Sequence, residues 1–270
     1  MYKSALQKLF VLLLMITLPV FIMKRHKLFR DRTAYVSSEQ HTQERVINDK
    51  HFVVTMPITL PLKKVESSLK NLMDQGYENY EIIFINSMES NQIHSELQQL
   101  YSKVEKELNK KGPSYSIKTN YYESIHQLKD NDIVIYLEAG DWLAKKSTME
   151  KLATIFSNTD VWLAYSPYIE YPSYQHKLEH PIKEEKWWKL HARKTEWLKS
   201  PLKVFYAGLF KEINFETVQS KNWQPAIQLN VFLTPMVDNA SKHIIYIKEV
   251  LYYHDDTDSN LHNVMVYDPT

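Results

Sequence analysis

Short apolar runs alternate with amphipathic segments from residue 52 to residue 166. The runs are rich in β-branched and aromatic residues, which is typical of buried strands. In the segments between them, apolar residues recur every three or four positions, the spacing of one helical face. The first such segment places Val65, Leu69, Leu72 and Met73 on one face and ends at Gly76. The pattern therefore predicts strands and helices in alternation.

The alternation predicts βαβ units and an α/β fold with a mostly parallel sheet. In such sheets ligands bind outside the carboxyl ends of the strands. Strands are predicted at 52–57, 80–86, 114–120, 132–138 and 160–166, and helices at 62–76, 93–112, 121–129 and 147–157.

The second half is less regular. Residues 171–203 are rich in Pro, Lys and aromatic residues, and their tryptophans are expected to pack on the sheet, with a contact to lipid or acceptor as the alternative. Residues 204–213 read as a buried segment entering a helix, and residues 227–241 as a helix interrupted near Pro235. Residues 243–254 read as strand.

Residues Leu9–Met23 form a run of apolar residues with one Thr and one Pro, with Lys8 before it and a basic stretch after it. Snorkelling lysines can extend such a run toward the roughly 20 residues that span a bilayer. We expect an N-terminal membrane anchor, with a cleaved signal peptide as the alternative. The basic flank predicts a cytoplasmic body, although a lumenal body is possible. Residues 1–50 are thus assigned to anchor and linker, and 51–270 to one domain.

Composition narrows the classes of function. The formal net charge is +1, which argues against a nucleic-acid-binding protein. Cysteine is absent, which excludes disulfides and thiolate metal sites. There are only four glycines, too few for a Gly-rich phosphate loop.

Two carboxylates flank a glycine where the most apolar strand ends, in the sequence Glu138-Ala139-Gly140-Asp141. One or two carboxylates with phosphate oxygens are enough to hold Mg²⁺, and glycine lets the backbone approach a phosphate closely. The other interpretation is that Asp141 caps the next helix and Glu138 is solvated. Asn86 ends the second predicted strand and Thr59 comes just after the first, so these three strand ends are expected to share one rim.

Several segments together resemble the family 2 glycosyltransferases of the GT-A fold. Residues 52–86 resemble that family's first strand, helix and second strand, and residues 120–143 resemble the segment leading into its acidic motif. The segments "VWLAYSPYIEYPS" and "VFYAGLFKEI" resemble later parts of a bacterial subgroup. The resemblance covers roughly residues 52 to 258. It implies a nucleotide-diphosphate sugar donor, here a UDP-sugar, and an inverting reaction on a cell-envelope glycan or lipid.

The resemblance also implies site residues. Mg²⁺ or Mn²⁺ would be held by Asp141, Glu138 and His254, with an exposed turn histidine as the alternative for His254. Contacts to the nucleotide-sugar are expected at Pro57, Thr59, Asn86, Asn120 and Glu138.

The general base is harder to assign. The acid that opens a helix in the family falls on or near Gln228, and an amide cannot accept the proton. Asp238 is the nearest substitute, and Glu216 a more distant one. Lys118, Arg193 and Lys203 are further cations that could face a diphosphate. The missing acids near 86 and 228 also motivate a second hypothesis, a catalytically impaired GT-A domain that acts as a membrane-tethered binding or scaffold subunit.

Overall fold

The computed structural model describes residues 49–58, 61–86, 91–177, 200–213, 229–240 and 243–257. All of these lie within one compact unit, Gln43–Thr270. The expected anchor at Leu9–Met23 lies outside the described residues and stays a prediction. Within the ranges above, no helix is long and apolar enough to cross a membrane.

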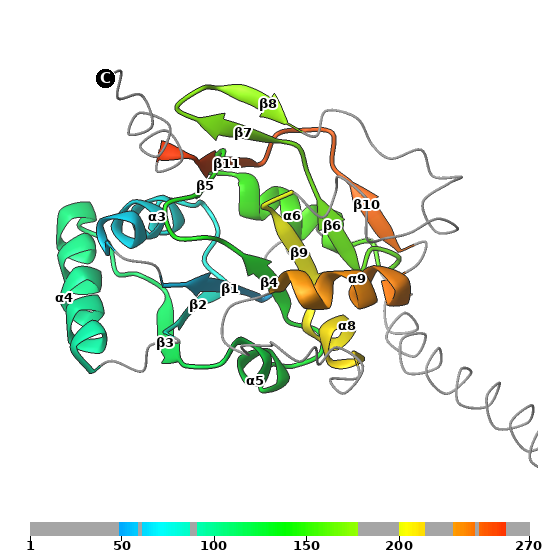
Figure 1. Cartoon of the computed structure of the whole chain (residues 1–270), viewed down its shortest axis with the longest axis horizontal. Coiled ribbons are helices and arrows are strands. Elements are labelled where there is room, and N and C mark those ends of the chain that lie inside the picture. The colour runs from blue at the N-terminus through cyan, green and yellow to red at the C-terminus, as the bar shows by residue number, and fades with distance from the viewer. Residues whose placement is uncertain are drawn as a thin grey trace, which may run out of the picture. The chain divides into compact units, whose positions relative to one another are not determined.

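A seven-stranded sheet forms the middle layer of the domain (Figure 1), in the order β10-β6-β9-β4-β1-β2-β3. Its strands are β1 Phe52–Pro57, β2 Tyr80–Ile85, β3 Ser114–Lys118, β4 Ile133–Tyr136, β6 Leu163–Tyr165, β9 Lys203–Tyr206 and β10 Ile244–Tyr246. Neighbouring strands are parallel except at β9, which is antiparallel to both β4 and β6. The predicted α/β fold with a mostly parallel sheet is confirmed, with β9 as a reversal that the sequence pattern did not show.

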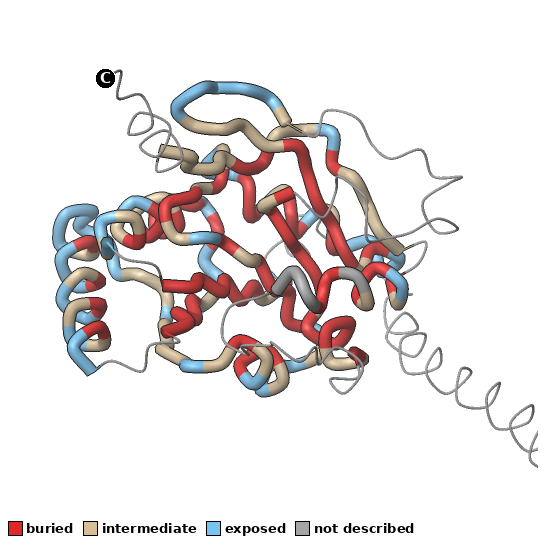
Figure 2. Tube along the Cα trace, viewed as in Figure 1, coloured by how far each residue is buried: buried red, intermediate tan, exposed pale blue. Residues whose placement is uncertain are grey.

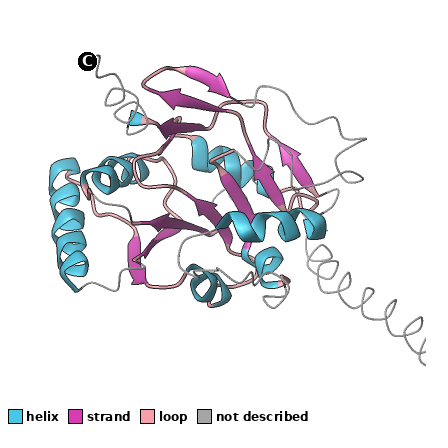
Figure 3. Cartoon of the chain, viewed as in Figure 1, coloured by secondary structure: helices cyan, strands magenta, loops and turns pink. Residues whose placement is uncertain are grey.

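Helices cover both faces of this sheet (Figure 3). One face carries α3 Lys63–Met73, α4 Asn91–Leu108 and α6 Thr148–Phe156. The other face carries α5 Tyr121–His126, α8 Ala207–Lys211 and α9 Leu229–Ala240. The predicted face of α3 is buried as expected.

The central strands are buried on both faces, which explains why they read as continuous apolar runs. Every residue of β1 is buried (Figure 2). Phe52, Val54 and Met56 point into the core under α3, while Val53 points into the core under α5 and α9.

Helix α9 continues through Pro235, where an interruption was expected. A proline inside a helix costs about 3 kcal/mol. Phe232, Leu233, Met236 and Val237 are all buried against the core on that face, and this burial outweighs the lost backbone hydrogen bond.

A second, four-stranded sheet has the order β5-β11-β7-β8. Its strands are β5 Trp142–Leu143, β7 Tyr168–Tyr171, β8 Gln175–Lys177 and β11 Tyr252–Asp255. β11 is antiparallel to β5 and parallel to β7. The sequence pattern showed neither β5 nor the β7–β8 hairpin. It also merged β10 and β11 into one strand, whereas the structure assigns them to different sheets.

Candidate metal centre

The carboxyl ends of β4, β1 and β2 lie along one rim of the large sheet, because these three strands are neighbours and parallel. Tyr136 of β4 pairs with Thr55, and Pro57 pairs with Ile85 at the end of β2. The predicted convergence of strand ends is confirmed for these strands. Thr59 lies outside the described residues.

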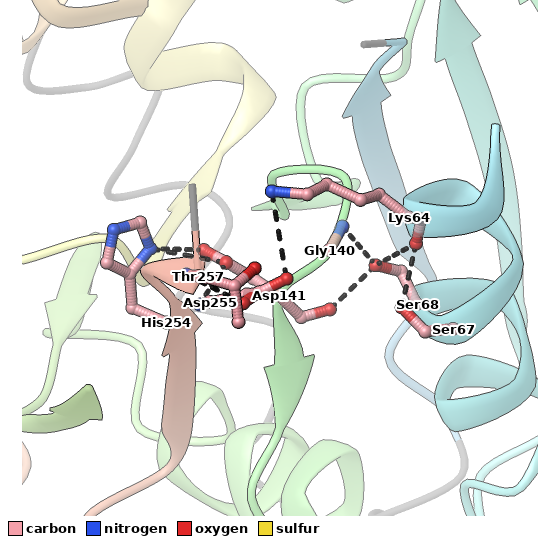
Figure 4. A network of polar contacts seen from close by, with 8 residues as sticks. All are labelled: Lys64, Ser67, Ser68, Gly140, Asp141, His254, Asp255 and Thr257. Carbon is pink, nitrogen blue, oxygen red and sulfur yellow. Dashed lines mark hydrogen bonds and ion pairs between the residues drawn. The ribbon is translucent and has the colours of Figure 1, made fainter. Parts of the chain in front are cut away.

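The turn that leaves β4 is held from α3 (Figure 4). The Ser68 hydroxyl accepts a hydrogen bond from the Gly140 amide at 2.9 Å and donates one to the Asp141 carbonyl at 2.7 Å. Gly140 has φ +105°, a conformation that side chains rarely adopt. A Cβ there would also lie 3.2 Å from the Oδ2 atom of Asp255 and from the Cδ atom of Lys64. Glycine is therefore required in the middle of the acidic turn.

The Asp141 carboxylate is 2 % exposed and accepts hydrogen bonds from three groups on β11, of which Figure 4 shows those of His254 and Asp255. The Tyr252 hydroxyl lies 2.6 Å from Oδ2, the His254 Nδ1 atom lies 2.9 Å from Oδ2, and the Asp255 amide lies 2.8 Å from Oδ1. The following helix begins at Thr148, with Ser147 at its N-cap position. Asp141 is therefore not a helix cap, and that interpretation is wrong.

Strand β11 reaches Asp141 because it pairs with β5, which directly follows the acidic turn. Trp142 pairs with Tyr253, and their rings stack at 5.5 Å. Asn71 of α3 exchanges two hydrogen bonds with the backbone of Leu143, at 2.9 and 3.0 Å. The turn is thus fixed on one side by α3 and on the other by β11.

The electrostatics of the cluster follow from these contacts. The hydrogen bond to Asp141 raises the pKa of His254, although partial burial opposes the shift. The Glu138 residue is exposed to solvent, yet neighbouring atoms partly desolvate its carboxyl group. That desolvation, followed by the charge of Asp141, raises the pKa of Glu138, while His254 and Lys203 oppose the shift.

Glu138, Asp141 and His254 each offer one ligand atom, and these atoms lie within 4.8 Å of one another. Two ligands on opposite sides of one Mg²⁺ are about 4.2 Å apart, so the spread is close to what a single ion needs. A donor set of two carboxylates and one imidazole fits Mn²⁺ better than Mg²⁺, because Mn²⁺ accepts nitrogen ligands more readily. The three residues expected to hold a metal are brought together, and their donor set fits a divalent cation.

The expected nucleotide-sugar contacts fall at different places. Pro57 ends β1 at the rim. Asn86 follows β2 at the same rim and is 1 % exposed, and its backbone amide donates to the Lys118 carbonyl at 2.7 Å. Asn120 is the N-cap of α5, where its side chain accepts from the Glu123 amide at 3.2 Å. A cap accounts for Asn120 without a ligand.

Asp238 lies away from the cluster. It is exposed, in the last turn of α9. The His243 amide donates to the Ala240 carbonyl at 2.9 Å, and the His243 carbonyl accepts from the Trp162 amide at 2.8 Å, just before β6. β6 runs in the same direction as β4. This end of α9 therefore lies near the amino ends of these strands, whereas Asp141 lies at the carboxyl end of β4. Gln228 and Glu216 lie outside the described residues.

Sequence reasoning missed Ser68 and Tyr252. Ser68 interrupts the apolar face of α3 between Val65 and Leu69, and a buried serine in such a face is a signal that was available. Tyr252 gave no signal, since it reads as one more apolar strand residue, and only the pairing of β11 with β5 brings its hydroxyl to Asp141.

No protein-family model and no curated protein matches the sequence. Similar solved structures exist. S. aureus TarS 1–349 matches with 14 % identity and a TM-score of 0.51, over 80 % of this chain and 63 % of that chain. The complex of S. aureus TarS 1–349 with UDP-GlcNAc matches with 12 % identity and a TM-score of 0.52, over 76 % of this chain and 58 % of that chain.

The chain thus spans about three fifths of the length of the TarS structures that it matches. At this level of identity the likeness concerns the fold. The layers, the mostly parallel sheet and the flanking helices described above are those of the GT-A fold. The expectation of a GT-A fold is therefore confirmed.

Proposed function

We propose that this domain is a metal-dependent glycosyltransferase. It would transfer a sugar from a nucleotide-diphosphate donor, a UDP-sugar, to a cell-envelope glycan or lipid, with inversion at the anomeric carbon. The observation that carries the proposal is the cluster of Glu138, Asp141 and His254 at the carboxyl rim of β4. Support for a UDP-sugar comes from the likeness in fold to TarS, which was solved with UDP-GlcNAc.

The chemistry requires that negative charge on the departing diphosphate be neutralised. A divalent cation bound by Glu138, Asp141 and His254 would supply that neutralisation as a Lewis acid. The chain itself supplies the rigid turn: Ser68 and Tyr252 fix Asp141, and Gly140 allows the positive-φ conformation that the turn requires.

The nucleotide would lie over the ends of β1 and β2, next to Pro57 and Asn86. Asn86 is neutral where the family carries an acid, so it would contribute hydrogen bonds to the base rather than charge. Asp238 remains a prediction for the general base. Its position near the amino ends of β4 and β6, away from Asp141, argues against this role. A membrane anchor at Leu9–Met23 and a cytoplasmic body remain proposals from the sequence.

Titration calorimetry of UDP into the full chain, with Mn²⁺ or with a chelator, tests the proposal. We expect binding only with Mn²⁺, and at least about tenfold weaker binding in Asp141→Asn, because the neutral amide offers one oxygen in place of a carboxylate. The matched control is Asp160→Asn, whose side chain is 84 % exposed and remote from the cluster. Wild-type protein that bound no UDP in the presence of Mn²⁺ would contradict the proposal.

One observation favours the second candidate, a binding or scaffold subunit. All three β11 donors already satisfy the Asp141 carboxylate, as a purely structural carboxylate would require. A structural role predicts that Asp141→Asn lowers stability and that metal-dependent UDP binding is absent. Metal-dependent binding with no donor hydrolysis and no transfer would indicate a binding subunit that retains the site.

A further inference from the structure

Lys203 lies at the same rim as the cluster, although it is distant in sequence. It is the first residue of β9, which runs antiparallel to β4, so the start of β9 lies beside the end of β4. Lys203 pairs with Tyr136, two residues before Glu138. Directly paired residues share a face of the sheet, and so do residues two apart along a strand.

The Lys203 residue is 3 % exposed, which is rare for a lysine. Burial lowers the pKa of its ammonium group to about 7, and the nearby charge of Glu138 only partly opposes the shift. No acceptor in the described part of the chain lies within hydrogen-bonding or ion-pairing distance of this ammonium group. A buried ammonium group without such a contact is costly, and the cost is relieved when an anion binds beside it.

Two other partly buried lysines show the contrast. Lys64, close to the acidic turn, lies 3.7 Å from Asp255. Lys211 of α8 lies 3.0 Å from Asp130, which precedes β4, whereas Glu138 follows that strand. Each of these has an acidic partner within 4.0 Å. Among the described residues, Lys203 has only the longer-range charge of Glu138 opposite it, so no acidic partner there holds its ammonium group as Asp255 and Asp130 hold those of Lys64 and Lys211.

We propose that Lys203 is a donor-binding residue whose ammonium group contacts an anionic oxygen of the nucleotide-sugar, next to the cation held by the cluster. This inference rests on the proposed function and adds to it a second positive group that does not depend on the metal. The oxygen has two possible sources. One is a phosphate of the diphosphate, common to all such donors, and the other is the carboxylate of a uronic acid sugar.

Calorimetry on the full chain with Mn²⁺ tests the inference with UDP, UDP-glucose and UDP-glucuronate as probes. The variant is Lys203→Met, which keeps the length of the side chain and removes the charge. A charge-assisted hydrogen bond corresponds to roughly a 10- to 100-fold loss of affinity. If the oxygen belongs to a phosphate, all three probes lose that much. If it belongs to a sugar carboxylate, only UDP-glucuronate does.

Lys211→Met is the matched control, because it removes a lysine charge at the amino end of β4, away from the cluster. Lys203→Gln, a shorter polar side chain, serves as the second variant in case Met at 203 disturbs folding, which thermal melting would reveal. Equal affinities of wild type and a folded Lys203 variant for all three probes would overturn the inference. A wild type that binds none of them contradicts the proposed function instead, so the two failures are distinguishable.

Discussion

The two sheets of this domain are stabilised in different ways. The central strands of the large sheet are buried on both faces between two layers of helices, as β1 and β4 show. The small sheet consists of strands of two to four residues, most of them half-buried, brought together from distant parts of the chain. The Asp141 carboxylate connects the two sheets, because Asp141 follows β4 of the large sheet and accepts hydrogen bonds from β11 of the small sheet. Apolar burial thus builds the support, and a few directional contacts build the site at its edge.

The largest expected effect concerns the large sheet. Phe205 of β9 is fully buried, so Phe205→Ala should lower the free energy of unfolding by about 3–5 kcal/mol. Trp142→Ala removes a half-buried ring of the small sheet and should cost about 1–2 kcal/mol. Urea denaturation of both variants measures the difference. Equal losses would show that the small sheet is as tightly coupled to folding as the core.

The next effect concerns the turn between the sheets. Gly140→Ala forces a side chain into a positive-φ conformation and should cost about 1–3 kcal/mol, with weaker UDP binding in the presence of Mn²⁺. Gly76→Ala is the control, because the nearest atom to its new Cβ is the end of the flexible Glu150 side chain. For both variants, thermal melting measures stability and calorimetry measures UDP binding. Unchanged binding in Gly140→Ala would show that the turn tolerates a different geometry.

A smaller effect depends on pH. The His254 pKa is raised above its ordinary value of 6.5 in the folded protein, mainly by the hydrogen bond to Asp141. The stability that this contact contributes is therefore fully present below about pH 6.5 and is lost as the pH rises through the raised folded pKa. Relative to His254→Gln, wild type should gain roughly 1 kcal/mol at low pH, allowing for screening of this partly exposed residue.

Urea denaturation of both proteins with a chelator present, from about pH 5.5 to about pH 9, measures this difference. A difference that grew with rising pH would contradict the sign of the shift.

The smallest effect is expected at Asp238. Because this exposed residue lies at the edge of the sheet opposite Asp141, Asp238→Asn should leave UDP binding, transfer rate and stability unchanged. Sugar transfer from a UDP-sugar in the presence of Mn²⁺ measures the rate. A rate that fell by about 100-fold or more, with binding intact, would instead identify Asp238 as the general base.

The sequence was informative wherever local periodicity and burial agree. The strands that are buried on both faces, and the helical face of Val65, Leu69 and Leu72, were predicted in place. The small sheet was not predicted, because its two- to four-residue strands carry too little pattern and depend on pairing with distant segments. For the same reason the acids of the site could be named, while Tyr252 and the burial of Lys203 could not.

The contacts of Asp141 have a consequence for the order in which the site can form during synthesis. Tyr252 and His254 follow Asp141 by 111 and 113 residues. A ribosome delivers the acidic turn and most of the large sheet long before it delivers β11. Until then the aspartate lacks all three of its donors, including His254. A chain interrupted after β9 would contain both neighbours of β4, β1 and β9, but neither Tyr252 nor His254 to complete the cluster at Asp141.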